Sequence, residues 1–167
     1  RFDQVVVATH SDQALGLLAD PGRDERQILG ALPYQANDVI LHTDTRLLPR
    51  KRSTWSSWNY RLGVDSGRAV VTYNMNILQG LDAPETFCVT LNDRDAINPN
   101  RILGEFRYDH PVFSLAGIDA QQRWGEINGV RNTWYCGAYW HNGFHEDGVV
   151  SALRVVEGIG GAGRAAA

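Results

Sequence analysis

The apolar positions at the start of the chain form a short continuous run. Residues 2–9 (FDQVVVAT) are rich in valine and bounded by polar residues, a pattern that predicts a buried strand of the kind found in a parallel sheet. Ser11 then offers a helix N-cap, and the apolar spacing after it predicts a short helix. A second short helix is expected over residues 23–32.

The middle of the chain follows patterns typical of strands. Strands are expected at residues 38–42, 55–62, 68–76, 86–92 and 102–108. The composition of residues 63–67 (GVDSG) predicts a hairpin loop between the second and the third of these strands. Together these segments predict an antiparallel sheet.

The last third of the chain combines helices with one more strand. Residues 114–127 carry apolar side chains at helical spacing, and residues 132–137 (NTWYCG) are typical of a short strand. Residues 147–159 are apolar around most of the helix circumference, which predicts a buried helix. The Gly- and Ala-rich residues 160–167 are expected to fray.

These patterns predict an α+β chain made of two kinds of material. The first strand and the last strand–helix pair are typical of an α/β domain, whereas the residues between them predict an antiparallel-sheet domain with helices. Such an arrangement results when one domain is inserted into another and the chain returns to the first domain at its end. The expected divisions are residues 1–10 for a returning strand, 11–130 for the inserted substrate-binding domain, 131–160 for the strand–helix segment and 161–167 for a flexible tail.

Composition and charge narrow the functional classes. Of the 167 residues, 43% are hydrophobic, which is enough for a core, and the net charge is −3. An acidic chain argues against a nucleic-acid binder, and the basic cluster Arg50-Lys51-Arg52 near Trp55 is interpreted as a solvated loop. Two cysteines, with no apolar run of about 20 residues, predict a cytoplasmic protein without a transmembrane segment.

The most informative segment covers residues 134–157 (WYCGAYWHNGFHEDGVVSALRVVE). It contains a strand that ends near a glycine, an aromatic loop and an abrupt apolar helix. The free N–H groups and partial positive charge of a helix N-terminus suit a phosphate or the edge of a reduced flavin. Glycines at 143 and 148 let a flat cofactor approach the backbone. The alternative is a helix capped by its own acids, Glu146 and Asp147.

This segment resembles the C-terminal FAD motif of flavin amine oxidases and phytoene-desaturase-like enzymes, in which a strand ending in Gly is followed by a loop and by Gly-aromatic-x-Glu at the start of a helix. Residues 2–9 with His10 are similar to the strand that returns from the substrate domain in that family. A bacterial subgroup of predicted NAD/FAD-binding, amine-oxidase-like proteins looks similar in the stretches SWNY (57–60), TYNMN (72–76), VTLN (89–92), HPVF (110–113) and GFHEDG (143–148).

The resemblance implies an FAD-dependent oxidoreductase that transfers hydride from an organic substrate to a noncovalently bound flavin. It also implies that the Gly-rich, ADP-binding half of the same protein is missing upstream, so that this chain alone is inactive. The positions that match the cofactor motif are Gly137, Ala138, Gly143, Phe144, Glu146, Asp147, Gly148 and Val149. The chain departs from the motif in having Asp147-Gly148 for Gly-Ala, Ser151-Ala152 for Ser-Gly, and Ala138 for an acid.

The candidates for the substrate cavity are aromatic: Trp58, Tyr60, Tyr135 and Trp140. Strand alternation puts Trp58 and Tyr60 on one face and Asn59 on the other, whereas Tyr135 and Trp140 flank the flavin motif. Further candidates are Trp55, Tyr73 and His42. The alternative is an aromatic core. The aromatic content and the resemblance to desaturases suggest a small, apolar substrate.

Two other features allow different interpretations. Residues 158–163 match GxGxxG, but the dinucleotide fingerprint needs a strand before it and a helix after it, so the segment is interpreted as a helix C-cap and tail. His141, His145 and Glu146, with Cys136, could suggest a metal site, which makes a metal-dependent hydrolase the alternative function. No metal is expected, because a glycine separates the two histidines where the chain is still a loop. A non-catalytic β-rich binding module is the third possibility.

Overall fold

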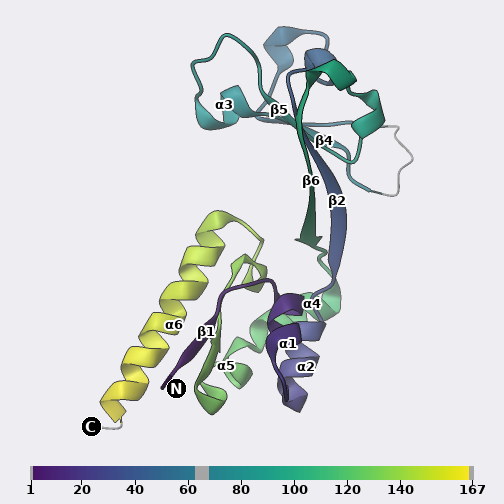
Figure 1. Ribbon diagram of the computed structural model, residues 1–167. Helices are drawn as coiled ribbons and strands as arrows, with labels where there is room; N and C mark the ends of the chain where they lie inside the picture. Colours follow the sequence, from purple (N-terminus) through teal and green to yellow (C-terminus); the bar gives the residue numbers. More distant parts are fainter. Residues whose placement is uncertain (1, 63–67, 166–167) are drawn as a thin grey trace. The chain divides into compact units, whose positions relative to one another are not determined.

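The computed structural model describes residues 2–62 and 68–165, with side chains as far as residue 161. The predicted hairpin loop at 63–67 lies outside the described residues. The chain divides into two compact units, one formed by Arg1–Gln35 with Pro111–Ala167 and the other by Ala36–His110 (Figure 1). Each unit is described by itself below.

The first unit contains a parallel pair of strands. Strand β1 (Val5–Val7) lies beside β7 (Thr133–Tyr135), with Val6 opposite Trp134. The predicted strand is present and its pairing is parallel, but the prediction that it is buried is wrong. Val5 and Val6 are 49% and 47% exposed. The reason is that β1 pairs only with β7 among the described residues, so its other edge is uncovered.

Four short helices form a hydrophobic core with this strand pair. They are α1 (Ser11–Leu17), α2 (Arg23–Gly30), α4 (Leu115–Gln122) and α5 (Trp124–Ile127). Ile28 and Leu29 of α2 are fully buried and pack with Ile127, Tyr135 and Trp140 in one core. The single helix predicted at 114–127 is two helices, because the backbone leaves helical geometry at residue 123 (φ −92°, ψ 14°).

Helix α6 (His145–Ala165) is the last element of the first unit. It contains the GxGxxG segment and runs through most of the residues predicted to be a frayed tail, so residues 161–165 are helical rather than irregular. Only one side of α6 is buried: Val155 packs with Trp134 and Cys136, whereas Val149, Leu153 and Val156 are more than half exposed. The prediction of an all-round buried helix is therefore wrong for the described residues.

The second unit is built on a five-stranded antiparallel sheet in the order β3-β4-β5-β2-β6. Its strands are β2 (Tyr34–His42), β3 (Trp58–Tyr60), β4 (Val71–Asn74), β5 (Cys88–Leu91) and β6 (Ile102–Pro111). All five overlap the predicted strands. The short helix α3 (Met75–Gln79) replaces the predicted end of the strand at 68–76, because the Asn74 side chain accepts a hydrogen bond from Ile77 N and starts a helical turn.

Short 3-10 turns connect these elements. They are η1 (Thr45–Leu47), η2 (Arg52–Thr54), η3 (Arg94–Ala96), η4 (Pro99–Arg101), η5 (Val130–Asn132) and η6 (Ala138–Trp140). In Figure 1 the helices α1, α2, α4 and α5, which fall within the predicted inserted domain, lie with β1 and β7. The fold is thus mixed helix and sheet, with compact units that divide near residues 35 and 111. None of the described helices combines the length and apolar character that crossing a membrane requires.

Candidate functional site

The segment that matches the flavin motif forms a tight connection between β7 and α6. The backbone N–H of Gly137 donates to the Ser151 hydroxyl at 2.8 Å, and this hydroxyl donates to the carbonyl of Gly148 at 2.9 Å. Ser151 is 1% exposed. The buried serine therefore ties the end of the strand to the first turns of the helix.

Three positions of this connection are glycine, and the structure gives a different account of each. A Cβ atom on Gly137 would lie 2.5 Å from Cε1 of Tyr139, so the packing of that ring requires glycine there. Gly143 has φ +88°, a left-handed conformation that favours glycine. A Cβ on Gly148 would meet only Ala138, at 3.8 Å or more, and its backbone is helical. Gly148 is therefore the one of the three that the described fold does not need.

The helix start also contains an internal cap. The backbone N–H of Phe144 donates to the Asp147 carboxylate at 2.9 Å. The helix is therefore capped by one of its own acids, which was the alternative interpretation of this segment. The cap uses a donor that precedes the helix, while Glu146 and the side chains of Phe144 and Val149 are exposed. The N–H groups of the first helical turn have no intrahelical acceptor, so the end of α6 keeps donors for an outside acceptor.

The four aromatic residues predicted to line the substrate cavity lie in two different environments. Tyr135 and Trp140 are core residues of the first unit, 0% and 2% exposed, and the Trp140 Nε1–H donates to the Tyr135 carbonyl at 3.2 Å. Trp58 and Tyr60 lie on one face of β3 and are 62% and 56% exposed. Alternation places these two rings on the open face of an edge strand, whereas burial of Tyr135 and Trp140 follows from their contacts with α2 and α5.

The remaining candidates are also accounted for by local contacts. Asn59, on the other face of β3, donates to the Thr72 carbonyl at 3.2 Å, and Trp55 donates to the Pro49 carbonyl at 2.8 Å. The guanidinium of Arg52, in the basic cluster, lies 5.2 Å from the centre of the Trp55 ring. Within residues 2–62 and 68–165 the structure brings together no three His, Cys, Asp or Glu side chains that could hold a metal ion. Cys136 is buried, whereas His141, His145 and Glu146 are exposed.

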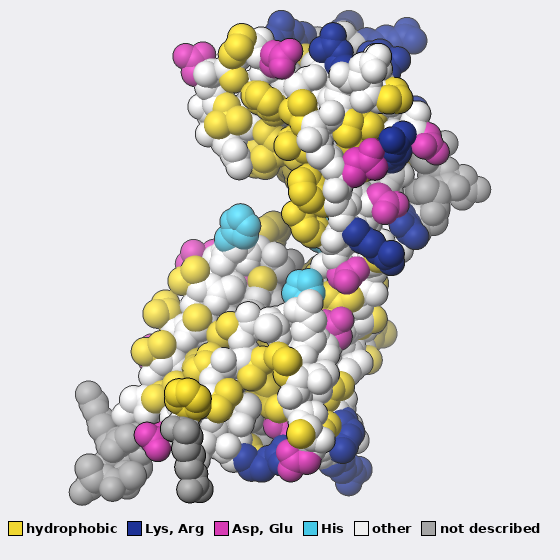
Figure 2. Space-filling model, in the orientation of Figure 1, with side chains coloured by type: hydrophobic (Ala, Val, Ile, Leu, Met, Phe, Trp, Pro, Cys, Tyr) yellow, Lys and Arg dark blue, Asp and Glu magenta, His cyan; other side chains and the backbone are white. Residues whose placement is uncertain are grey.

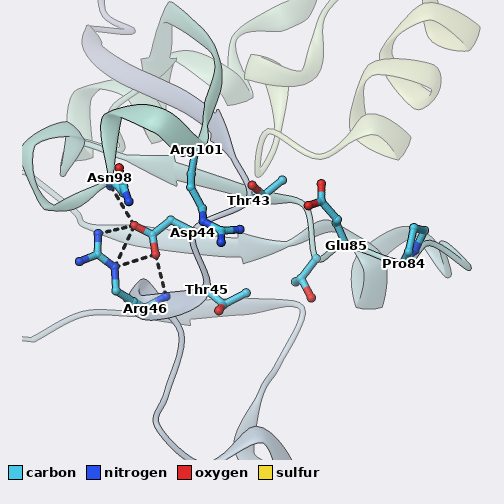
Figure 3. A pocket seen from close by; sticks show the side chains of 9 residues that line it. Thr43, Asp44, Thr45, Arg46, Pro84, Glu85, Asn98 and Arg101 are labelled. Atoms are coloured by element: carbon cyan, nitrogen blue, oxygen red, sulfur yellow. Dashed lines mark hydrogen bonds and ion pairs between the residues drawn. The ribbon is translucent and has the colours of Figure 1, made fainter.

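A polar pocket in the second unit was not predicted. It has a volume of about 520 Å³ and is lined by the segment that follows β2, the loop before β5, and η4 (Figure 3). The Asp44 carboxylate organises one wall: it accepts from Arg46 Nη2 at 2.6 Å and from the backbone N–H of Asn98 at 2.8 Å. These contacts, the Arg46 side chain first, outweigh burial and lower the pKa of Asp44 far below its usual value.

A chain of buried polar side chains lies under this wall. His42, 0% exposed, accepts at Nδ1 from the backbone N–H of Asp44 at 3.0 Å. Because a backbone N–H can only donate, the neutral ring carries its proton on Nε2 and donates to the Thr90 hydroxyl at 2.7 Å. The Thr90 hydroxyl in turn lies 2.9 Å from that of Thr72. His42 is thus a structural group of the sheet and does not line the pocket.

This arrangement predicts a loss of stability in mild acid. Burial lowers the pKa of His42 below its usual 6.5, although the nearby Asp44 acts in the opposite direction. The unfolded chain therefore binds a proton before the folded one does, and stability falls as the pH drops below about 6.5. Urea unfolding at pH 7.5 and 5.5 should show this loss for the wild type, and the loss should be smaller in His42→Gln. An unchanged pH dependence in that variant would contradict the assignment.

One signal in the sequence could have indicated this pocket. The apolar strand DVILH is followed at once by the polar run Thr43-Asp44-Thr45-Arg46, and such a run at a strand end is where side chains meet a loop-built pocket. The other lining residues, Asn98 and Arg101, are distant from this run in the sequence, so only the fold shows that they meet it.

Comparison with known proteins identifies no family for this chain. No family model matches it, and a search of curated proteins finds no match.

Proposed function

We propose that this chain is the C-terminal part of an FAD-dependent oxidoreductase and that the β7–α6 connection contacts the flavin. The observation that carries the proposal is Gly148, a glycine in the second turn of α6 that neither sterics nor backbone conformation requires. A residue without a side chain at this point leaves the helix backbone open to a flat ligand. The position lies in the segment that resembles the motif of flavin amine oxidases, which has another small residue, alanine, at this point.

The surface of the first unit supports a missing upstream half. The unpaired edge of β1 borders an apolar groove of about 450 Å³ along Val5–Thr9, with Leu17 and Leu18 on its far side. Apolar side chains gather around β1 and along α6 on the face seen in Figure 2. Exposed apolar patches beside an unpaired strand edge are typical of surfaces that another segment covers. We assign this edge to the nucleotide-binding half of the same protein.

The chemistry divides between cofactor and protein. FAD, when bound, supplies the hydride acceptor. In this proposal the first turn of α6 offers N–H donors and partial positive charge to a flavin edge, which gains negative charge on reduction. No described side chain is assigned as a catalytic base. The substrate we expect is a small, apolar organic molecule, and turnover of hydrophilic amines alone would count against that expectation.

The compartment that we propose for the protein is the cytoplasm. Both cysteines, Cys88 and Cys136, are free and buried, which suits a reducing compartment of this kind.

The first test is the visible absorption spectrum of the whole protein, this chain preceded by its native upstream sequence, purified without added cofactor. Flavin absorption bands, with FAD released on denaturation, are the expected result. A colourless protein that stays colourless after FAD is added would reject the flavin proposal, and metal analysis would then test the hydrolase alternative.

A substitution at Gly148 tests the site itself. Gly148→Ala removes a helix-interior glycine where a methyl group has room, so the protein should gain up to about 1 kcal/mol of stability. The family that this segment resembles carries alanine at this position, so Gly148→Ala should keep FAD in the whole protein. The larger side chain of Gly148→Leu should hinder a flavin that approaches the backbone, so FAD occupancy should fall severalfold. Gly160→Leu is the matched control, since residue 160 lies in the same helix and a Cβ there meets nothing within 4 Å. Equal FAD content in the two leucine variants would contradict contact at Gly148.

A further inference from the structure

The polar pocket of the second unit carries two opposite charges that have no ion-pair partner among the described residues. The Asp44 carboxylate and the Arg46 guanidinium that line it are already paired with each other. Arg101 and Glu85 also line it, and neither side chain forms an ion pair within the described part of the chain. In the view of Figure 3, Arg101 extends between Asp44 and Glu85. Within the described residues, the pocket therefore offers the Arg101 guanidinium and the Glu85 carboxylate to a ligand.

Both charged residues are held by backbone contacts rather than by their side chains. The carbonyl of Arg101 accepts from Thr43 N at 3.0 Å, at the end of a 3-10 turn that Asn98 caps. The carbonyl of Glu85 accepts from the Asn76 side chain at 2.9 Å, and the same side chain accepts from Phe87 N at 2.8 Å. The loops that carry the two charges are thus anchored before any ligand binds, while the guanidinium and the carboxylate remain available.

The lining between the charges is hydroxylic. Thr43, Thr45 and Thr86 border the pocket, and their hydroxyls take part in no hydrogen bond among the described residues. A threonine hydroxyl both donates and accepts, so it can satisfy either end of a polar ligand. A ligand with only negative charge would meet Glu85, and one with only positive charge would meet Arg101. The arrangement therefore favours a molecule that carries both charges.

We propose that this pocket binds a small zwitterion, with its carboxylate on Arg101 and its ammonium group on Glu85. The inference concerns the Ala36–His110 unit alone and does not depend on the flavin proposal. A guanidinium matches a carboxylate through paired N–H donors, and charge-assisted contacts of this kind are the stronger hydrogen bonds in proteins. The pocket of about 520 Å³ has room for a ligand of amino-acid size.

The test is isothermal titration of the protein with glycine, β-alanine, γ-aminobutyrate and 5-aminovalerate, a series that varies only the separation of the two charges. One length should bind best. Arg101→Gln and Glu85→Gln should each weaken that binding about tenfold or more, since each removes a charge-assisted contact. Arg94→Gln is the matched control, because Arg94 is another exposed arginine of the same unit that pairs with Glu105 outside the pocket.

Butyrate and butylamine, which carry one charge each, separate the zwitterion from simpler ligands. Both should bind about tenfold or more weakly than the preferred amino acid. Binding of butyrate or inorganic phosphate as tight as that of the amino acid would overturn the proposal, as would no binding by any member of the series. Equal affinity in Arg94→Gln and Arg101→Gln would overturn it as well, with circular dichroism confirming that the variants are folded.

Discussion

Glu25→Ala should destabilise the first unit by about 2–4 kcal/mol. Glu25 is 4% exposed, and its carboxylate accepts three hydrogen bonds from different parts of the first unit. Its donors are the backbone N–H of Gly22 at 2.5 Å, the Arg131 guanidinium at 2.6 Å and the Tyr135 hydroxyl at 2.7 Å. Truncation removes the cap of α2 and leaves the hydroxyl of a fully buried tyrosine without its acceptor. Urea unfolding followed by the helical circular dichroism signal measures the loss.

Asp20→Ala is the control for this prediction. Asp20 also pairs with Arg131, at 3.0 Å, but its side chain is 88% exposed. Screened surface pairs contribute little, so this variant should stay within about 0.5 kcal/mol of the wild type. Similar losses in the two variants would show that the Arg131 pairing, rather than the buried hydrogen bonds of Glu25, dominates.

The effect of Glu25 should also depend on pH. Burial raises the pKa of this carboxyl, but the hydrogen bonds from Tyr135, Gly22 and Arg131 together outweigh burial and lower it below 4.5. A carboxyl whose pKa is lower in the folded state contributes its stability above the unfolded value. The difference between wild type and Glu25→Ala should therefore shrink as the pH falls below about 4.5.

Gly158→Ala should destabilise the packing of α6 on β7 by about 1–3 kcal/mol, even though alanine is the better helix former. A Cβ at this position would lie 2.4 Å from Cζ3 and 2.6 Å from Cη2 of Trp134. The ring has little room to move. Its Nε1–H donates to the Gln4 side chain at 2.7 Å, and the Cβ position of Gly129 lies only 3.1 Å from Cη2.

Gly160→Ala, two residues further along the same helix, should change stability in the opposite direction. Nothing lies within 4 Å of its added methyl group, so only the gain in helix propensity remains, up to about 1 kcal/mol. Thermal and urea unfolding of the two variants give the comparison. Adding Trp134→Leu to Gly158→Ala should recover part of the loss, and strict additivity of the two substitutions would contradict the steric explanation.

The elements that were predicted well have strong local patterns. Val5–Val7 and the VIL of residues 39–41 are continuous apolar runs between polar residues, and both lie in strands. The first predicted helix begins at Ser11, although its N-cap is His10 rather than Ser11, and residues 23–30 form the second helix. The parallel pairing of β1 with β7 agrees with the parallel-sheet character of the first strand, but the sequence patterns did not identify the partner strand.

The errors arise where structure depends on distant residues. Val5, Val149 and Leu153 are apolar, and the pattern alone could not show that the described chain leaves them uncovered. Tyr135 and Trp58 are both aromatic, yet α2 and α5 bury the first while β3 lies at a sheet edge and exposes the second. The polar pocket was missed for the same reason, since its walls come from three separate segments, residues 43–46, 84–86 and 98–101, that only the fold brings together.

The hydroxyl chain from His42 through Thr90 to Thr72 also determines how three strands align. Thr72 lies directly opposite Thr90 on β4 and β5, and Cys88 lies opposite His42 on β5 and β2. A slip of one residue would turn the threonines to the opposite face of the sheet, and a slip of two would separate donors from acceptors inside the protein. Each wrong alignment would leave buried polar groups without partners. The His42 imidazole, through its hydrogen bond to Thr90, therefore favours the native register of the sheet over shifted ones.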